Sequence, residues 1–180
     1  MSEATAPQAH ILIVDDEEGV RNALRRVLRK EDYRLSFAGS ADEALEFLKT
    51  SQPDVILSDH LMPGMTGLEM LKLCRMRHPQ IGRVVLTGQA EMETVIQAIN
   101  DGEVFRFLTK PWSDEEVKLT LHMALTHVRA EREQARLLRQ FEGQTRELRS
   151  LEGDHPGIGS VTRDHTGAIL IEDDETPSDG

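Results

Sequence analysis

Carboxylates, a threonine and a lysine follow short apolar runs in this sequence, and together they could transfer a phosphoryl group. Asp15 and Asp16 follow the run ILIV directly, and Asp59 follows the run VIL after one serine. Thr87 comes directly after a later apolar run, and Lys110 follows another after one threonine. These residue types can provide a nucleophile, ligands for a hard cation and positive charge for a phosphate.

The three carboxylates would repel each other if they met, and the pKa of at least one would rise. A bound Mg²⁺ removes this conflict, because it takes oxygen ligands and needs only one or two carboxylates beside water and phosphate. We therefore predict a magnesium site made by Asp15, Asp16 and Asp59. A carboxylate such as Asp59 can also attack phosphorus and form an acyl phosphate. Lys110 would neutralise the phosphoryl oxygens, and the hydroxyl of Thr87 would hydrogen-bond to one of them.

Simpler interpretations exist for single residues. An Asp–Asp pair after a strand often only caps a helix, and a single lysine is often just a surface residue. The joint placement of these side chains after separate strands favours a site. His60 is interpreted as an exposed loop residue, Gly67 as part of a turn, and Cys74 as a buried structural thiol.

The elements that must position these side chains can be inferred from the apolar pattern. Continuous aliphatic runs predict strands buried on both faces, whereas an alternating run predicts an edge strand. Residues 33–38 alternate and should form the edge. The predicted strands are Ile11–Val14, Tyr33–Ala38, Val55–Leu57, Val84–Leu86 and Val104–Leu108.

Segments of helical period separate the strands, so the chain alternates strictly between strand and helix. One helical stripe contains Val95, Ile96 and Ile99, and Gly102 is expected to end that helix. Helix starts are predicted where a hydroxyl residue precedes a glutamate by three positions, at Ser40/Glu43, Thr66/Glu69 and Ser113/Glu116. This alternation predicts an α/β fold with a parallel sheet, helices on both faces and a ligand site at the carboxyl ends of the strands.

Composition excludes several function classes. The net charge is −11, and residues 172–180 hold five acidic residues and no base, which argues against nucleic-acid binding. No segment approaches the roughly 18 apolar residues that span a membrane. The single cysteine fits a reducing compartment. We therefore expect a cytoplasmic protein with no nucleic-acid or membrane partner.

The chain is longer than one such domain needs, and we predict four parts. Residues 1–9 are expected to be a disordered leader, and 10–128 the α/β domain. Residues 129–152 should extend the last helix as a possible coiled coil, because Leu137, Phe141, Leu148 and Leu151 share one heptad seam. Residues 153–180 should form a tail with a possible β-hairpin and an acidic disordered end. We see no output domain.

The combination of motifs resembles the receiver domain of two-component response regulators, of the chemotaxis-regulator type. The matching stretches are ILIVDDE (11–17), DVILSDHLMPGMTGLE (54–69), VVLTGQ (84–89) and FRFLTKPW (105–112). The resemblance covers residues 10 to about 128. It implies the flavodoxin-like strand order 2-1-3-4-5, with an elongated C-terminal helix following in this chain.

The resemblance also implies roles for individual residues. Asp59 would be the phosphoacceptor, with Thr87 and Lys110 contacting the phosphoryl group. Asp16, Asp59 and the backbone carbonyl of Leu61 would bind Mg²⁺ directly, and Asp15 would act largely through water. The Lys110–Pro111 bond would be cis. Residues with a role in switching would be Thr87 and Phe107, which would reshape the face made by the fourth helix, fifth strand and fifth helix.

Expected partners follow from this resemblance. A histidine kinase or a histidine phosphotransfer protein would supply the phosphoryl group in a phosphorelay, an unidentified protein would read the switched face, and the heptad seam would allow a homodimer. We expect a phosphoacceptor with at most self-dephosphorylation, not an enzyme. Two alternatives stay open: a dimerisation adaptor with a non-switching receiver, and an aspartyl-phosphate phosphatase. The chain departs from the usual family pattern at Phe107, which replaces a tyrosine, and at the apolar Leu61.

Overall fold

The computed structural model describes the backbone of residues 8–154 and the side chains of these residues except 144 and 146–154. The chain divides after Glu133 into two compact units, each of which is described by itself. Residues 1–7 of the predicted leader and 155–180 of the predicted tail lie outside the described residues. The predicted ends of both segments were wrong, because Ala9 is the first residue of a buried strand and residues 153–154 belong to the last helix.

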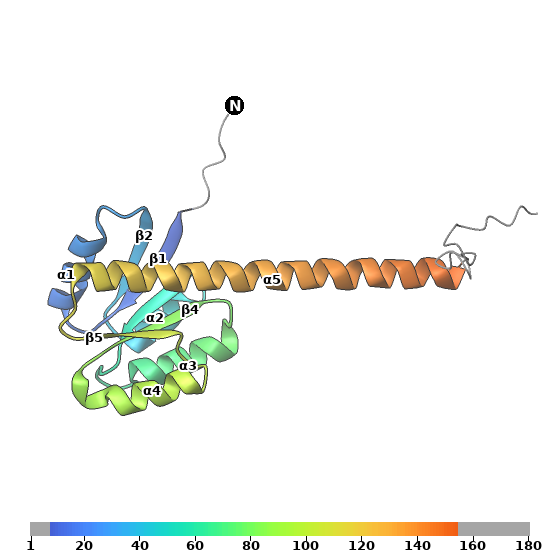
Figure 1. Ribbon diagram of the computed structural model, residues 1–180. Coiled ribbons are helices and arrows are strands. Elements are labelled where there is room, and N and C mark those ends of the chain that lie inside the picture. Colours follow the sequence, from blue (N-terminus) through green and yellow to red (C-terminus); the bar gives the residue numbers. More distant parts are fainter. Residues whose placement is uncertain (1–7, 155–180) are drawn as a thin grey trace, which may run out of the picture. The chain divides into compact units, whose positions relative to one another are not determined.

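The first unit contains a five-stranded parallel sheet of order β2-β1-β3-β4-β5 (Figure 1). This confirms the predicted α/β fold and the edge position of β2. The strands are β1 (Ala9–Val14), β2 (Tyr33–Ala38), β3 (Val55–Asp59), β4 (Gly82–Thr87) and β5 (Arg106–Thr109).

Helices connect successive strands, and all strand pairs are parallel. The helices are α1 (Glu18–Leu28), α2 (Ala41–Phe47), α3 (Gly67–Arg77), α4 (Met92–Asn100) and α5 (Asp114–Asp154), with a short 3₁₀ turn over Gln89–Glu91.

Apolar side chains fill both faces of the sheet, which explains the continuous aliphatic strands. One core joins Leu12 and Ile56 of the sheet to α2, α3 and α4, for example through Leu71 and Val95. The other core joins alternate sheet residues to α1 and α5, with Leu121 among its fully buried side chains. Because neighbouring residues of a strand point to opposite faces, the central strands must be apolar at almost every position.

The predicted helix starts are present. Thr66 and Glu69 form a complete capping box, and so do Ser113 and Glu116. At α2 the hydroxyl of Ser40 caps the helix as predicted, but the Glu43 carboxylate accepts from the amide of Gly39. The hydrogen bonds satisfy amide groups that have no partner within the helix.

Two local predictions were wrong. The fifth strand begins at Arg106, because the amides of Glu103 and Val104 donate instead to the carbonyl of Ala98 at the end of α4. Ile96 does not belong to the buried stripe of α4, since its side chain is 46% exposed. Val95 and Ala98 form the buried side of that helix. Gly102 has a φ of +69° and follows the helix end, as predicted.

Helix α5 contributes to both units. Within the first unit, Val117 and Val128 mark the ends of its buried stretch against the sheet. In the second unit its apolar side chains are exposed, with Leu137 at 47% and Phe141 at 69%. The side chains of the other two predicted seam leucines lie outside the described set. Helix α5 reaches Asp154, slightly beyond the predicted extension. Within the described residues, no helix is long and apolar enough to cross a membrane.

Candidate functional site

The carboxyl ends of the strands bring the predicted reactive residues together. Asp59 and Thr87 are the last residues of β3 and β4, while Asp15 follows β1 and Lys110 follows β5. The Lys110 Nζ atom lies 2.6 Å from Asp59 Oδ1 and 3.4 Å from Asp15 Oδ2. The Lys110 amide donates to the carbonyl of Thr87 at 2.8 Å, which aligns these strand ends. The structure therefore brings the carboxylates of Asp15 and Asp59 to the ammonium group of Lys110, and it joins Thr87 to the same residue through the backbone.

Burial and charge act against each other in this cleft. Asp15 is 1% exposed, and burial is the largest cause that raises the pKa of its carboxyl group. The nearby charge of Asp59 raises that pKa further, whereas the amide of Glu17 and the charge of Lys110 lower it. Burial alone would lower the pKa of Lys110, but its hydrogen bond to Asp59 and the two carboxylate charges raise it overall. The site thus holds a charged lysine and favours added positive charge near Asp15.

Three carboxylates form the predicted metal site, Asp15, Asp16 and Asp59. In the described part of the chain, no three His, Cys, Asp or Glu side chains gather into a ready-made metal site. Asp15 and Asp59 both contact the Lys110 ammonium, and the side chain of Asp16 is exposed. This donor set still suits Mg²⁺, which keeps several waters and needs few carboxylates.

Gly67 shapes the candidate site, although the sequence pattern assigned it only to a turn. A Cβ atom on this residue would lie 1.8 Å from the carbonyl oxygen of Asp59 and 2.8 Å from Ser58 Oγ. The Gly67 amide also donates to the carbonyl of His60 at 2.8 Å. The start of α3 is therefore pressed against the backbone of the candidate phosphoacceptor. The available signal in the sequence was a glycine directly after the capping residue Thr66, where a close approach of another backbone could require the absence of a side chain.

His60 is not the exposed loop residue that the sequence suggested. Its side chain is 8% exposed, and its Nδ1 atom is buried without a hydrogen-bond partner among the described residues. The amide of His60 donates to the carbonyl of Leu86 at 2.8 Å, which continues the pairing of β3 and β4 past Asp59. This pairing explains the burial. The prediction for Cys74 is confirmed, because its side chain is 0% exposed.

Arg21 was also missed by the sequence reasoning. Arg21 lies near the start of α1, and its guanidinium donates a hydrogen bond to the backbone carbonyl of Asp15. The Glu17 amide donates to the side chain of the same aspartate at 2.8 Å. Hydrogen bonds therefore fix both the backbone carbonyl and the side chain of Asp15 in the loop after β1. The spacing of six residues alone could not show this contact, because it depends on the direction in which the Arg21 side chain leaves α1.

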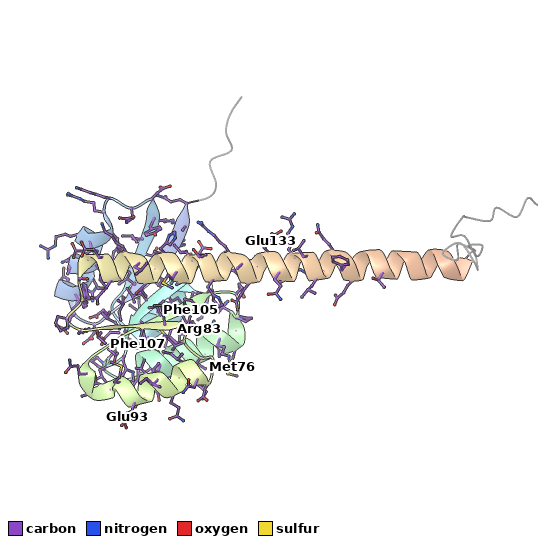
Figure 2. The ribbon with its side chains drawn as sticks, viewed as in Figure 1. Met76, Arg83, Glu93, Phe105, Phe107 and Glu133 are labelled. Atoms are coloured by element: carbon purple, nitrogen blue, oxygen red, sulfur yellow. The ribbon has the colours of Figure 1, made fainter. Side chains whose placement is uncertain are left out.

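The predicted switch residues lie beside the cleft. Thr87 is 1% exposed, and its hydroxyl donates to the carbonyl of Gly88 at 3.1 Å. Phe107, labelled in Figure 2, is partly buried and packs against the core shared with α2, α3 and α4. Leu61 is 56% exposed. The Lys110–Pro111 peptide bond is cis, as the resemblance implied.

Comparisons with known proteins agree with this geometry. The pattern of the response regulator receiver domain matches residues 11–122. The hydrogenase transcriptional regulatory protein HoxA of Cupriavidus necator is 40% identical over 118 residues, which cover 66% of this chain and 24% of that protein. The DNA-binding transcriptional regulator NtrC of Klebsiella pneumoniae is 35% identical over 115 residues, covering 64% of this chain and 24% of that protein.

A solved structure shows the same fold. The signal receiver domain of an HD domain-containing protein from Pseudomonas fluorescens Pf-5 superimposes with a TM-score of 0.68 at 36% identity. That match covers 74% of this chain and 98% of the other. The chain spans about a quarter of the length of the curated relatives named above. The sequence pattern, the fold and the strand-end cleft lead to the same result: this chain belongs to the response regulator receiver family of two-component signalling.

Proposed function

We propose that Asp59 accepts a phosphoryl group from a histidine kinase or a histidine phosphotransfer protein, with Mg²⁺ bound in the same cleft. The supporting observation is the contact of the Lys110 ammonium with both Asp59 and Asp15 at the carboxyl ends of the strands. A phosphoryl group on Asp59 would lie next to the positive charge of the Lys110 ammonium. Phosphoryl transfer depends on such positioning and charge stabilisation more than on proton chemistry.

In the proposed reaction, a carboxylate oxygen of Asp59 attacks the phosphorus of a phosphohistidine. The new oxygen–phosphorus bond forms as the nitrogen–phosphorus bond breaks, and the bonding pair returns to the imidazole of the donor. Lys110 moves its contact from the Asp59 carboxylate to a phosphoryl oxygen, and Thr87 offers its hydroxyl to another. When bound, Mg²⁺ would neutralise charge on the phosphoryl oxygens, held by Asp16, Asp59 and the carbonyl of Leu61, with Asp15 acting through water.

The acyl phosphate would act as a switch. A phosphoryl group adds about 1.5 to 2 negative charges and three acceptor oxygens. To reach it, the hydroxyl of Thr87 must leave the carbonyl of Gly88. The space that Thr87 leaves would let Phe107 pack further inward, which changes the face formed by α4, β5 and α5. A protein partner that prefers the changed face would convert phosphorylation into a signal.

Two experiments separate this function from its alternatives. Stoichiometric labelling by a small acyl phosphate or amidophosphate supports the switch, whereas steady turnover of an external phosphate ester supports a phosphatase. Capture of a partner from cell lysate should depend on beryllofluoride, which mimics a phosphoryl group. If partner binding and oligomeric state were the same with and without beryllofluoride, the non-switching adaptor would be supported.

Leu61 is expected to lengthen the life of the acyl phosphate. Its exposed side chain lies two residues after Asp59, and Gln89 is exposed two residues after Thr87. An apolar side chain at the mouth of the cleft gives the attacking water no hydrogen-bond partner. We predict that Leu61→Asn loses its phosphoryl group several-fold faster in a dephosphorylation time course. Equal rates for the two proteins would exclude this role.

We also propose that the second unit forms a homodimer through the helical seam of α5. Leu137 and Phe141 expose apolar side chains at heptad spacing, and Leu138 beside them is 57% exposed. A helix with such a stripe gains stability when a second copy covers it. Sedimentation should show a concentration-dependent dimer that the double substitution Leu137→Lys and Phe141→Lys converts to a monomer. A wild-type chain that stays monomeric at high concentration would contradict the proposal.

A further inference from the structure

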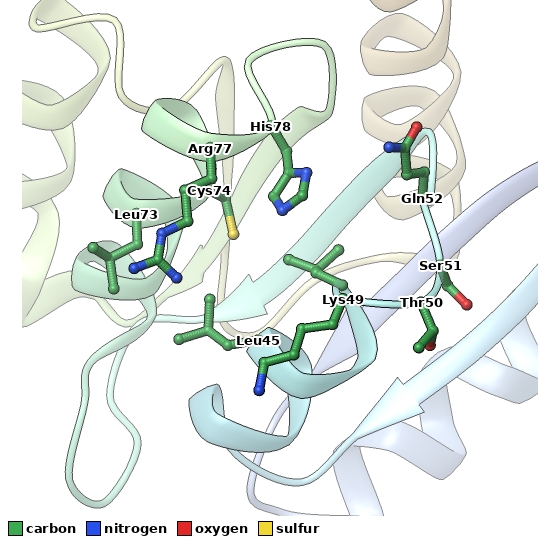
Figure 3. Close-up of a pocket in the computed structure, with 10 residues that line it drawn as sticks. Leu45, Lys49, Thr50, Ser51, Gln52, Leu73, Cys74, Arg77 and His78 are labelled. Carbon is green, nitrogen blue, oxygen red and sulfur yellow. The ribbon is translucent and has the colours of Figure 1, made fainter.

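A second site is suggested by a cavity of about 630 Å³ between the C-terminal parts of α2 and α3 and the loop that leads into β3 (Figure 3). Four other cavities in the described residues measure about 250 to 510 Å³. The loop enters β3 at the end opposite to Asp59, because Asp59 is the last residue of that strand. The cavity is therefore separate from the candidate phosphoacceptor site.

The floor of this cavity is apolar. Leu48 and Cys74 are 3% and 0% exposed, and Leu45 and Leu73 complete the apolar lining. Figure 3 shows the Cys74 sulfur directed between the two helices. Burial raises the pKa of this thiol to about 11, so it is neutral at physiological pH and adds to the apolar surface. Such a floor can receive the hydrocarbon body of a ligand.

The rim of the cavity is basic, although the chain as a whole carries a net charge of −11. Lys49, Arg77 and His78 line it, and no Asp or Glu does. Each of the four other cavities includes an acidic residue in its lining. The Lys49 ammonium already contacts Glu46 at 2.5 Å, whereas Arg77 forms no ion pair within residues 8–154. The side chains of Thr50, Ser51 and Gln52 add hydrogen-bond donors.

We propose that this cavity binds a small organic anion: a compact aromatic or aliphatic body bearing one carboxylate or sulfonate. The body would lie on the leucine and cysteine floor, and the anionic group would meet the Arg77 guanidinium. A guanidinium binds an oxyanion through two parallel hydrogen bonds, which makes Arg77 the residue that selects for charge. The volume falls within the range of about 300–1,000 Å³ typical of small-molecule sites. An inorganic phosphate would leave the floor unused, and a neutral apolar compound would leave Arg77 unused.

A matched pair of probes tests both halves of the proposal on the full chain. Anilinonaphthalenesulfonate and phenylnaphthylamine share one aromatic body, and only the first carries a sulfonate. Fluorescence titration should show saturable binding of the sulfonate, roughly tenfold tighter than that of the neutral compound, because one charge-assisted contact to an arginine is worth about that factor.

Variants assign the binding to this cavity. Arg77→Glu should weaken sulfonate binding by roughly tenfold or more and leave the neutral probe unchanged. Ser51→Trp, which places a bulky ring at the rim, should weaken both probes, and circular dichroism would check its fold. Arg26→Glu makes the same charge change on exposed α1 and should alter neither. No saturable binding, equal affinity for the two probes, or sulfonate binding that survives Arg77→Glu would overturn the proposal.

Discussion

Replacing Asp59 with Asn is expected to abolish phosphoryl uptake from a small acyl phosphate, while the receiver stays folded. Asparagine has nearly the same shape, and its amide oxygen can still accept a hydrogen bond from Lys110, which lies 2.6 Å from Asp59 Oδ1. It lacks the negative charge that makes a carboxylate oxygen nucleophilic and a good ligand for Mg²⁺. Labelling should therefore fall from one phosphoryl group per chain to none. Chelation of Mg²⁺ with EDTA should have the same effect on the wild-type protein.

The matched control makes the same chemical change at an exposed carboxylate. Asp42 lies in the first turn of α2 and is exposed, so Asp42→Asn should be labelled as fully as the wild type. Thermal unfolding of both variants would show that neither change disrupts the fold. Full labelling of Asp59→Asn would show that another residue accepts the phosphoryl group.

Replacing Gly67 with Ala is expected to cause the largest loss of stability among single-methyl changes in the cleft. The added Cβ would lie 1.8 Å from the Asp59 carbonyl oxygen and 2.9 Å from its carbonyl carbon. Backbone atoms of a buried strand cannot move away as the tip of a flexible side chain can. Either α3 or the end of β3 must shift, which should lower the free energy of unfolding by about 3 kcal/mol or more. Chemical denaturation measures this change, and labelling should fall in parallel.

Gly19 provides the control for this substitution. It lies near the start of α1, and no atom lies within 4 Å of the position of an added Cβ. Gly19→Ala should therefore raise stability by roughly 0.5–1 kcal/mol, because alanine loses less conformational freedom than glycine in a helix. If Gly67→Ala behaved like Gly19→Ala, the close packing of α3 against Asp59 would be refuted.

The features that sequence could predict are those set by local pattern. Continuous aliphatic runs located the three interior strands, since only a strand covered on both faces needs apolar residues at successive positions. The alternating pattern of residues 33–38 located the edge strand β2. The capping boxes at Thr66 and Ser113 followed from side chains three residues apart. The cluster of Asp15, Asp59 and Lys110 followed from one topological rule, that parallel strands share their carboxyl edge.

The features that sequence could not predict depend on how elements pack against each other. The Gly67 contact exists only because α3 packs against the end of β3, and the Arg21 contact only because its side chain on α1 reaches the carbonyl of Asp15. His60 was taken for an exposed residue because nothing local shows that its amide pairs with Leu86 or that its side chain is buried. Ile96 was placed in the core because its spacing fits a helical stripe, yet that stripe is wider than the surface that α4 buries.

The most direct test of the account locates the phosphoryl group in the wild-type chain. After labelling with an acyl phosphate and Mg²⁺, borohydride would reduce an aspartyl phosphate to homoserine, and peptide mass spectrometry would identify the changed residue. We predict homoserine at position 59 in proportion to the phosphoryl uptake. Homoserine at Asp15 or Asp16, or full uptake with an unchanged Asp59 and a phosphoryl group on His60, would contradict the proposed function.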